Sequence, residues 1–125
     1  HLLNTSFIVA PGYEKAALLH DKSEGYTNDI VTPLKIQVPL FKEIETKIEA
    51  GESARYGVPY PFAPEVKLAD LQMLAIEKHI LKPSSSHWAI LDGIEWEHLL
   101  DRVIMSPMTP DVAKRAFLQR WEEVR

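Results

Sequence analysis

The chain has 125 residues, no cysteine, 46% hydrophobic and 26% charged residues, and a formal net charge of −4 at pH 7. This is enough chain for one domain with a real core, and the composition is that of an ordinary globular protein. The absence of cysteine excludes disulfides and thiolate metal sites. No apolar run approaches the roughly 18 residues of a membrane span, and the 14 basic residues are scattered along the chain, which argues against binding long nucleic acid.

The first third of the chain predicts two helices. Residues 1–10 are mostly apolar, as at the end of a buried helix, and Pro11-Gly12 ends that helix and lets the chain reverse. Residues 13–26 read as a second helix, and antiparallel packing of the two would bring His1 beside His20. The loop that follows is expected to be pinned to the core by three aliphatic residues, Ile30, Val31 and Leu34.

A third helix is expected over residues 40–56, and its pattern predicts which side faces the core. Phe41, Ile44 and Ile48 are spaced for one buried face. The other face is predicted to be solvated and carries Lys42, Glu43, Glu45, Lys47 and Glu49. Residues 57–64, GVPYPFAP, must form a loop, and a loop of this composition is suited to one wall of a pocket.

The remainder of the chain is also predicted to be helical. A helix is expected over residues 65–81, then a Pro/Ser loop over 82–87 and a short helix over 95–104. Thr109-Pro110-Asp111 is a strong helix start, and this last helix is expected to bury Ala113, Phe117 and Trp121. Because no internal repeat and no alternating strand pattern occurs, the predicted fold class is all-α.

The adjacent His20 and Asp21 are the first candidates for chemistry. Glu24 and Asp29 follow them closely, and if residues 13–26 form one helix, Glu24 lies on the same side as His20 and Asp21. An imidazole and two carboxylates suit a divalent cation. A His-Asp pair is common by chance, however, so the same residues also fit a solvated helix end with ordinary charges.

Asp70 is the second candidate, because it interrupts the apolar stripe of the 65–81 helix. A buried carboxylate without a partner is costly, so Asp70 requires a cation, which is either a metal ion or a neighbouring Lys or Arg. Glu77, two turns further on, either supports such a site or has a structural role. His98 and Asp101 are spaced like a ligand pair but lack a further partner, and they read as ordinary surface residues.

These residues form a pattern that resembles the HD-domain phosphohydrolase superfamily. The run LLHD-x-x-E-x-x-x-x-D-x-x-x-P-x-K is similar to that of bacterial 5'-deoxynucleotidases and phage deoxynucleoside triphosphohydrolases of the dATP triphosphohydrolase type. Its members here are Leu18, Leu19, His20, Asp21, Glu24, Asp29, Pro33 and Lys35. The resemblance implies a compact helical bundle with one divalent ion (Mn, Co, Zn, Fe, Ni or Mg) on four ligands: His1, His20, Asp21 and Asp70.

The resemblance also implies roles for the other matched residues. Glu24 would orient a water molecule or take its proton, Asp29 would assist the leaving oxygen or hold Glu24, and Lys35 would neutralise phosphate charge. The expected reaction is cleavage of the 5' phosphoester of a (deoxy)nucleotide to nucleoside plus phosphate or triphosphate. The base would stack on Tyr60, Phe62 or Trp88. A catalytically silent nucleotide-binding or regulatory module is the alternative, followed by a purely structural helical protein.

The resemblance further implies a helix before the first metal histidine. We therefore expect residues 1–125 to be a single HD-type domain that is incomplete at its N-terminus. We also expect a homo-oligomer, a dimer or a hexamer, because relatives are commonly oligomeric. The lack of cysteine fits a reducing compartment, so a cytoplasmic location is expected, or the host cytoplasm if the protein is encoded by a phage.

Overall fold

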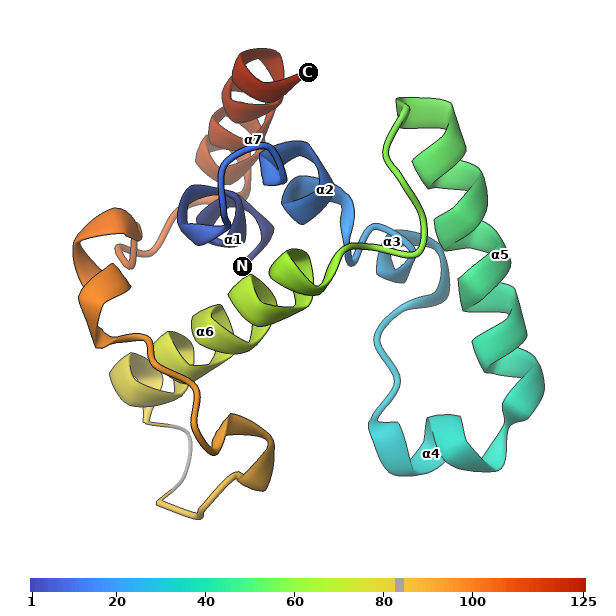
Figure 1. The fold of residues 1–125 in the computed structure, drawn as a ribbon, viewed down its shortest axis with the longest axis horizontal. Coiled ribbons are helices and arrows are strands. Elements are labelled where there is room, and N and C mark those ends of the chain that lie inside the picture. Colours follow the sequence, from blue (N-terminus) through green and yellow to red (C-terminus); the bar gives the residue numbers. More distant parts are fainter. Residues whose placement is uncertain (83–84) are drawn as a thin grey trace.

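Prolines set the start of the long helices. In the computed structural model, which describes residues 1–82 and 85–125, α5 (Pro39–Tyr56), α6 (Pro64–Leu81) and α7 (Pro110–Val124) each begin at a proline, whose fixed φ suits the first turn (Figure 1). The other elements are α1 (Leu2–Ile8), α2 (Glu14–Leu19), α3 (Glu24–Thr27), α4 (Thr32–Gln37) and the 3-10 helices η1 (Ala89–Leu91) and η2 (Glu97–Arg102). The described residues contain no strand, so the predicted all-α class is confirmed.

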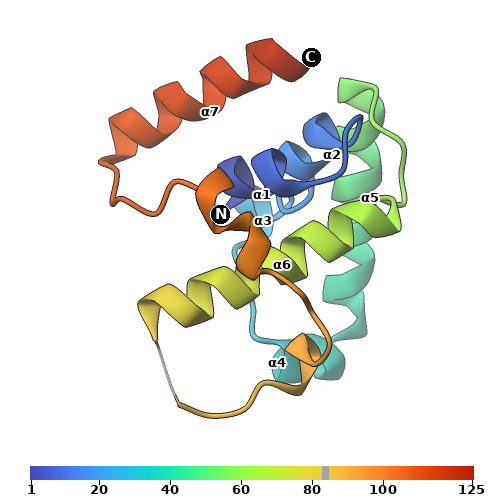
Figure 2. The same ribbon diagram turned by 60° about the vertical axis from the view of Figure 1, so that its left-hand side comes forward.

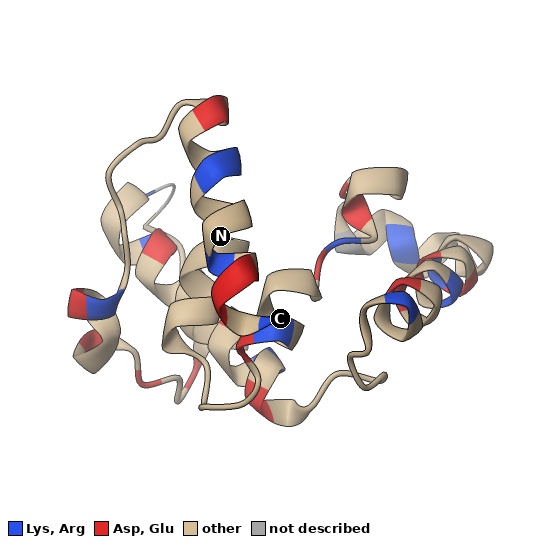
Figure 3. Ribbon diagram, turned by 90° about the horizontal axis from the view of Figure 1, so that it is seen from above, with Lys and Arg blue, Asp and Glu red and all other residues tan. Residues whose placement is uncertain are grey.

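Basic and acidic residues are mixed over the surface, in keeping with the scattered basic residues of the sequence. Lys and Arg alternate with Asp and Glu over the helical body and over α5 (Figure 3). None of the helices described here combines the length and the apolar character that crossing a membrane requires.

The core lies where α1, α2 and α6 meet. Ala17 on α2 and Met73 and Ile76 on α6 are fully buried in one apolar cluster. The chain reversal between α1 and α2 uses Gly12 at a φ of 91°, a conformation that glycine adopts without strain. The two short helices consequently pack against each other and lie over α6 (Figures 1 and 2).

The predicted helix over residues 13–26 is wrong, because the chain forms two separate pieces there. Helix α2 ends at Leu19, and the backbone then tightens, with Lys22 N–H donating to Leu19 O at 3.0 Å and Glu24 N–H to Asp21 O at 3.0 Å. Residues 20–25 include no large apolar side chain, so no apolar face extends the helix, although His20 and Ser23 are buried. Glu24 therefore starts a new helix and does not continue the helical face of residue 20.

The predicted orientation of helix α5 is correct only in part, because Lys42, Glu43 and Lys47 are exposed as predicted but Glu45 turns inward. Glu45, expected in solvent, is 3% exposed, whereas Ile44, expected in the core, is 42% exposed. The cause lies in what α5 faces. Lys35 Nζ is 2.9 Å from Glu45 Oε1, and the Tyr60 hydroxyl donates to Glu49 at 2.8 Å. Since the neighbours here are a cation and a hydroxyl, the side of α5 that carries Glu45 and Glu49 is packed.

We call residues 31–56, which carry α4 and α5, the α4–α5 arm. The arm stands to one side of the helical body (Figure 1). Val31 and Leu34, predicted to pin this region to the core, are instead exposed, and only Ile30 is half-buried. Polar contacts attach the arm to the body, among them an ion pair between Lys22 and Glu52.

The C-terminal third packs more loosely than predicted. The expected helix over residues 95–104 is the shorter 3-10 helix η2, and residues 83–84 of the expected 82–87 loop lie outside the described residues. Helix α7 begins as predicted but buries none of its side chains fully, and Ala113 is exposed. The Arg120 guanidinium ties α7 to α1 by donating to Ser6 O at 2.9 Å, and Trp121 meets Tyr56 edge-on.

Candidate metal centre

Three helices bring together the four residues that the sequence nominated as metal ligands. His1 precedes α1, His20 and Asp21 directly follow α2, and Asp70 lies within α6. One ligand atom from each lies within 4.8 Å of those of the other three. The packing of α1 against α2 thus places His1 beside His20, as the sequence predicted.

The ring nitrogens Nε2 of both histidines face the carboxylates. His1 Nε2 lies 3.0 Å from Asp70 Oδ1, and His20 Nε2 lies 3.6 Å from the same oxygen and 3.1 Å from Asp21 Oδ2. The other nitrogen of each ring is engaged elsewhere. His20 Nδ1 is 2.7 Å from the Ala17 carbonyl oxygen and His1 Nδ1 is 3.0 Å from Glu77 Oε1.

The engaged Nδ1 atoms fix which tautomer the neutral rings adopt. A carbonyl oxygen can only accept, so His20 Nδ1 carries the proton and its Nε2 has a free lone pair. This is the arrangement of histidine ligands in metal sites, where the second nitrogen donates to a carbonyl or a carboxylate.

His20 Nε2 is also a buried polar atom without a hydrogen-bond partner among the described residues. Asp21 Oδ2 is close, but the contact is an ion pair that lacks hydrogen-bond alignment. Leaving such an atom unsatisfied costs about 1–3 kcal/mol. A cation between the imidazoles and the carboxylates would satisfy it, and two nitrogens with two carboxylate oxygens suit a borderline divalent ion.

The carboxylates make this a place where positive charge is favoured. Burial opposes protonation of His1, but its hydrogen bonds to Asp70 and Glu77 outweigh burial and raise its pKa to about 10. Burial opposes protonation of His20 too, yet the contacts with Asp21 and Asp70 raise its pKa to about 9. Although burial alone would raise the pKa of Asp70, the two histidines and Lys67 hold it well below its usual range.

Glu24 interacts electrostatically with Asp21, one of the four candidate ligands, and has an altered acidity. Its burial, together with the negative charges of Asp21 and Asp29, raises its pKa, while Lys35 opposes the shift. A carboxylate with a raised pKa accepts a proton more readily at neutral pH. Although the helix is interrupted before α3, Glu24 is therefore still influenced by the charge of Asp21.

Lys35 is held by acids. Its Nζ lies 2.9 Å from Glu45 Oε1 and 3.8 Å from Asp29 Oδ1. The hydrogen bond to buried Glu45 raises the pKa of Lys35 despite its partial burial. The sequence missed Glu45, and no local signal could have identified it, because the helical pattern assigned it to the solvated face.

Lys67 is a second cation at the centre that the sequence did not single out. Its Nζ lies 2.6 Å from Asp70 Oδ2, and its side chain is 65% exposed. It lines a pocket of about 170 Å³ that contains His20, Asp21 and Asp70. The spacing of Lys67 and Asp70, three residues apart on one helix, is the signal that could have identified it. Asp70 thus has the neighbouring lysine and also faces both histidines.

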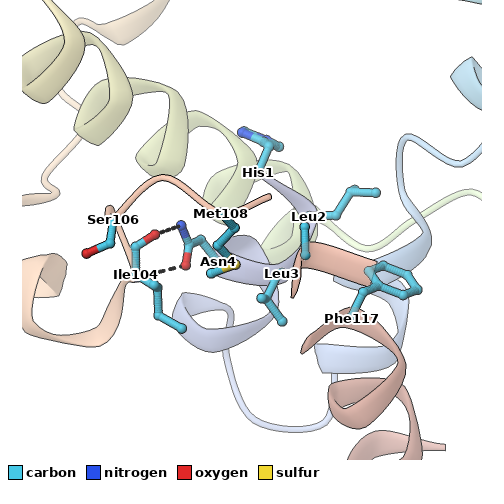
Figure 4. A pocket seen from close by; sticks show the side chains of 9 residues that line it. His1, Leu2, Leu3, Asn4, Ile104, Ser106, Met108 and Phe117 are labelled. Carbon is cyan, nitrogen blue, oxygen red and sulfur yellow. Dashed lines mark hydrogen bonds between the residues drawn. The ribbon is translucent and has the colours of Figure 1, made fainter. Parts of the chain in front are cut away.

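The predicted base-stacking residues are divided between different hollows. Phe62 lines the same 170 Å³ pocket, and Tyr60 meets Phe62 edge-on at 5.7 Å between ring centroids. Trp88 lines a separate hollow beside Lys78. A hollow of about 470 Å³ on the far side of His1 is mainly apolar, and there Asn4 hydrogen-bonds both backbone groups of Ile104 (Figure 4).

The fold and this cluster define an all-helical protein with a candidate centre of two histidines and two aspartates. The chain is 34% identical over 125 residues to the uncharacterized protein YfdR of Escherichia coli (strain K12), a match that covers 99% of this chain and 68% of YfdR. It belongs to the same family as YfdR. No family model matches the chain, and no solved structure matches it.

Proposed function

We propose that this protein is a divalent-metal-dependent phosphohydrolase of the HD-domain superfamily. It would cleave the 5' phosphoester of a (deoxy)nucleotide and give nucleoside plus phosphate or triphosphate. The observation that carries the proposal is the convergence of His1, His20, Asp21 and Asp70 around an unsatisfied, buried His20 Nε2. The matched residues Glu24, Asp29 and Lys35 support it, because they lie on the segment that follows the His-Asp pair.

The four ligand residues would hold one ion, with Mn, Co, Zn, Fe, Ni and Mg as the candidates. When bound, such an ion would act as a Lewis acid toward a phosphate ester and would make hydroxide available near neutral pH. Glu24 would orient the attacking water and accept its proton, for which its raised pKa is favourable. As the bond between the α phosphorus and the 5' oxygen breaks, that oxygen requires a proton. Glu24 would return the proton that it took from water, and Asp29 would assist the leaving oxygen or hold Glu24.

Two lysines would compensate phosphate charge. Lys67 is the more accessible, since it is largely exposed and borders the pocket of the candidate ligands. Lys35 is already paired with Glu45, so its role would be to hold Asp29 as well as to face the phosphate. A pocket of about 170 Å³ suits a phosphate group with part of a sugar, and Phe62 and Tyr60 offer rings to the base.

Further parts of the proposal concern the setting of the enzyme. The substrate is a free nucleotide, because long nucleic acid binds through many basic contacts and the net charge here is −4. We also propose a cytoplasmic location and a homo-oligomer, a dimer or a hexamer. Light scattering of the protein with its natural termini would test the oligomer, and a monomeric mass would refute it.

Product analysis tests the proposal directly. The metal-loaded protein is incubated with ribo- and deoxynucleoside mono- and triphosphates, and free nucleoside with phosphate or triphosphate is expected. Activity confined to cyclic dinucleotides or polynucleotides would refute it. Binding of nucleotide and metal without product would favour the silent regulatory module.

Two variants separate chemistry from metal binding. Glu24→Ala should lower turnover by about two orders of magnitude or more with little change in metal content, because general bases contribute on that scale. Asp70→Ala should lose the ion itself. Equal metal loss in both variants would make Glu24 a metal ligand and contradict its role as a base.

A further inference from the structure

Glu77 contacts His1, one of the four candidate metal ligands, on the side of the ring that faces away from the other ligands. It lies two helical turns after Asp70 on α6, so both carboxylates project from the same side of that helix. The ring of His1 spans them. Its Nδ1 lies 3.0 and 3.1 Å from the two oxygens of Glu77, and its Nε2 lies 3.0 Å from Asp70 Oδ1.

His1 depends on Glu77 in a way that His20 does not. The ring of His20 is 7% exposed and is fixed within its own helix by the Ala17 carbonyl. His1 precedes the first helical residue of α1, and its ring is 27% exposed. The Glu77 carboxylate therefore holds Nδ1 of His1 in the way that the Ala17 carbonyl holds Nδ1 of His20.

We infer that Glu77 is a positioning residue for the metal centre. Its carboxylate accepts the hydrogen of His1 Nδ1, while Nε2 donates to Asp70 in the metal-free protein. When a cation replaces the Nε2 proton, the hydrogen held at Nδ1 by Glu77 leaves the Nε2 lone pair directed at the centre. A negative charge on the far side of an imidazole also makes the ring a stronger donor to a cation. Glu77 itself stays out of the coordination shell, because the ring stands between it and the centre. This inference rests on the proposed metal dependence.

A purely structural role would make a different prediction. If Glu77 only tied α6 to the start of α1, its removal would lower the stability of the metal-free fold and leave the intrinsic affinity for the cation unchanged. Metal affinity and metal-free stability must therefore be measured separately.

The experiment compares Glu77→Ala and Glu77→Gln with Glu65→Gln, a control in the first turn of the same helix. Affinities for Zn²⁺ and Co²⁺ are measured by chelator competition on the protein with its natural termini, and the melting temperature is measured without metal. Glu77→Ala should bind both ions about 10- to 100-fold more weakly. Glu77→Gln should recover part of this loss, since its amide oxygen still accepts a hydrogen bond, and Glu65→Gln should match the wild type.

The Co²⁺ absorption spectrum provides a readout that a structural tie would not change. A shifted visible band in Glu77→Ala, with the wild-type band in Glu65→Gln, would support a reoriented His1 ring. Wild-type affinity and spectrum in Glu77→Ala, whatever its melting temperature, would overturn the inference alone. A wild-type protein that binds no divalent cation would overturn both the inference and the proposed metal dependence.

Discussion

Replacing Glu45 by alanine should destabilise the fold far more than a helix-surface mutation does. Glu45 is 3% exposed and pairs with Lys35 at 2.9 Å. Removing one partner of a buried ion pair costs about 3–5 kcal/mol. The Lys35 side chain is 25% exposed and has Asp29 at 3.8 Å, so part of its charge finds water or another acid. We therefore expect a loss of about 2–3 kcal/mol in the free energy of unfolding.

Urea unfolding followed by circular dichroism measures this loss, and Glu43→Ala is the matched control. Glu43 is two residues earlier on the same helix and is exposed, so its removal should change the free energy of unfolding by no more than about 0.5 kcal/mol. If the two variants were equally stable, the inward position of Glu45 would be refuted, and the solvated position predicted for it from the sequence would be correct.

Three further predictions concern packing and pH. Ile44→Ala should cost less than about 1 kcal/mol and Met73→Ala about 2–5 kcal/mol in urea unfolding, because Ile44 is exposed and Met73 is fully buried; the reverse order would contradict the core described here. The raised pKa values of His1 and His20 stabilise the metal-free fold fully below pH 6.5, and this stability is lost as pH rises through about 9 to 10. The melting temperature without metal should thus fall from pH 6.5 to 10, and a flat profile would contradict these shifts. Metal binding at pH 7 should release about one proton from each imidazole, measurable by calorimetry in buffers of different ionisation enthalpy.

The boundaries of the long helices α5 and α6 and the start of α7 were predictable, and the inward position of Glu45 on α5 was not. Prolines at positions 39, 64 and 110 lie at helix starts. Because the fixed φ of proline suits the first turn of a helix, these starts can be predicted from the residue type alone. The orientation of α5 depends on what lies opposite. Periodicity groups Glu45 with Glu49 and Ile44 with Ile48, but it does not say that Lys35 and Tyr60 will approach the acidic group.

Three of the four candidate ligands have a local signal in the sequence, whereas His1 was expected only from the family resemblance, and the surrounding residues were predictable only in part. His20 and Asp21 are adjacent, and Asp70 stands out as a carboxylate in an apolar stripe, so each carries a local signal. Lys67 has a weaker signal in its spacing from Asp70. Glu45 has none, because its partner Lys35 precedes it by ten residues across a change of helix.

The polar attachment of α5 divides the molecule into parts with different local stability. The four candidate ligands lie on segments anchored to the apolar core of α1, α2 and α6, whereas residues 24–56 attach mainly through charges and hydroxyls, with Tyr56 at the end of α5 packed against that core. Segments held by few apolar contacts open at lower free energy than the core does, and their amide hydrogens exchange sooner. The arm and the Glu24 segment would therefore form one cooperative unit of exchange and the ligand-bearing helices another. A brief opening of the first unit would move the proposed base away while the ion-binding residues kept their places.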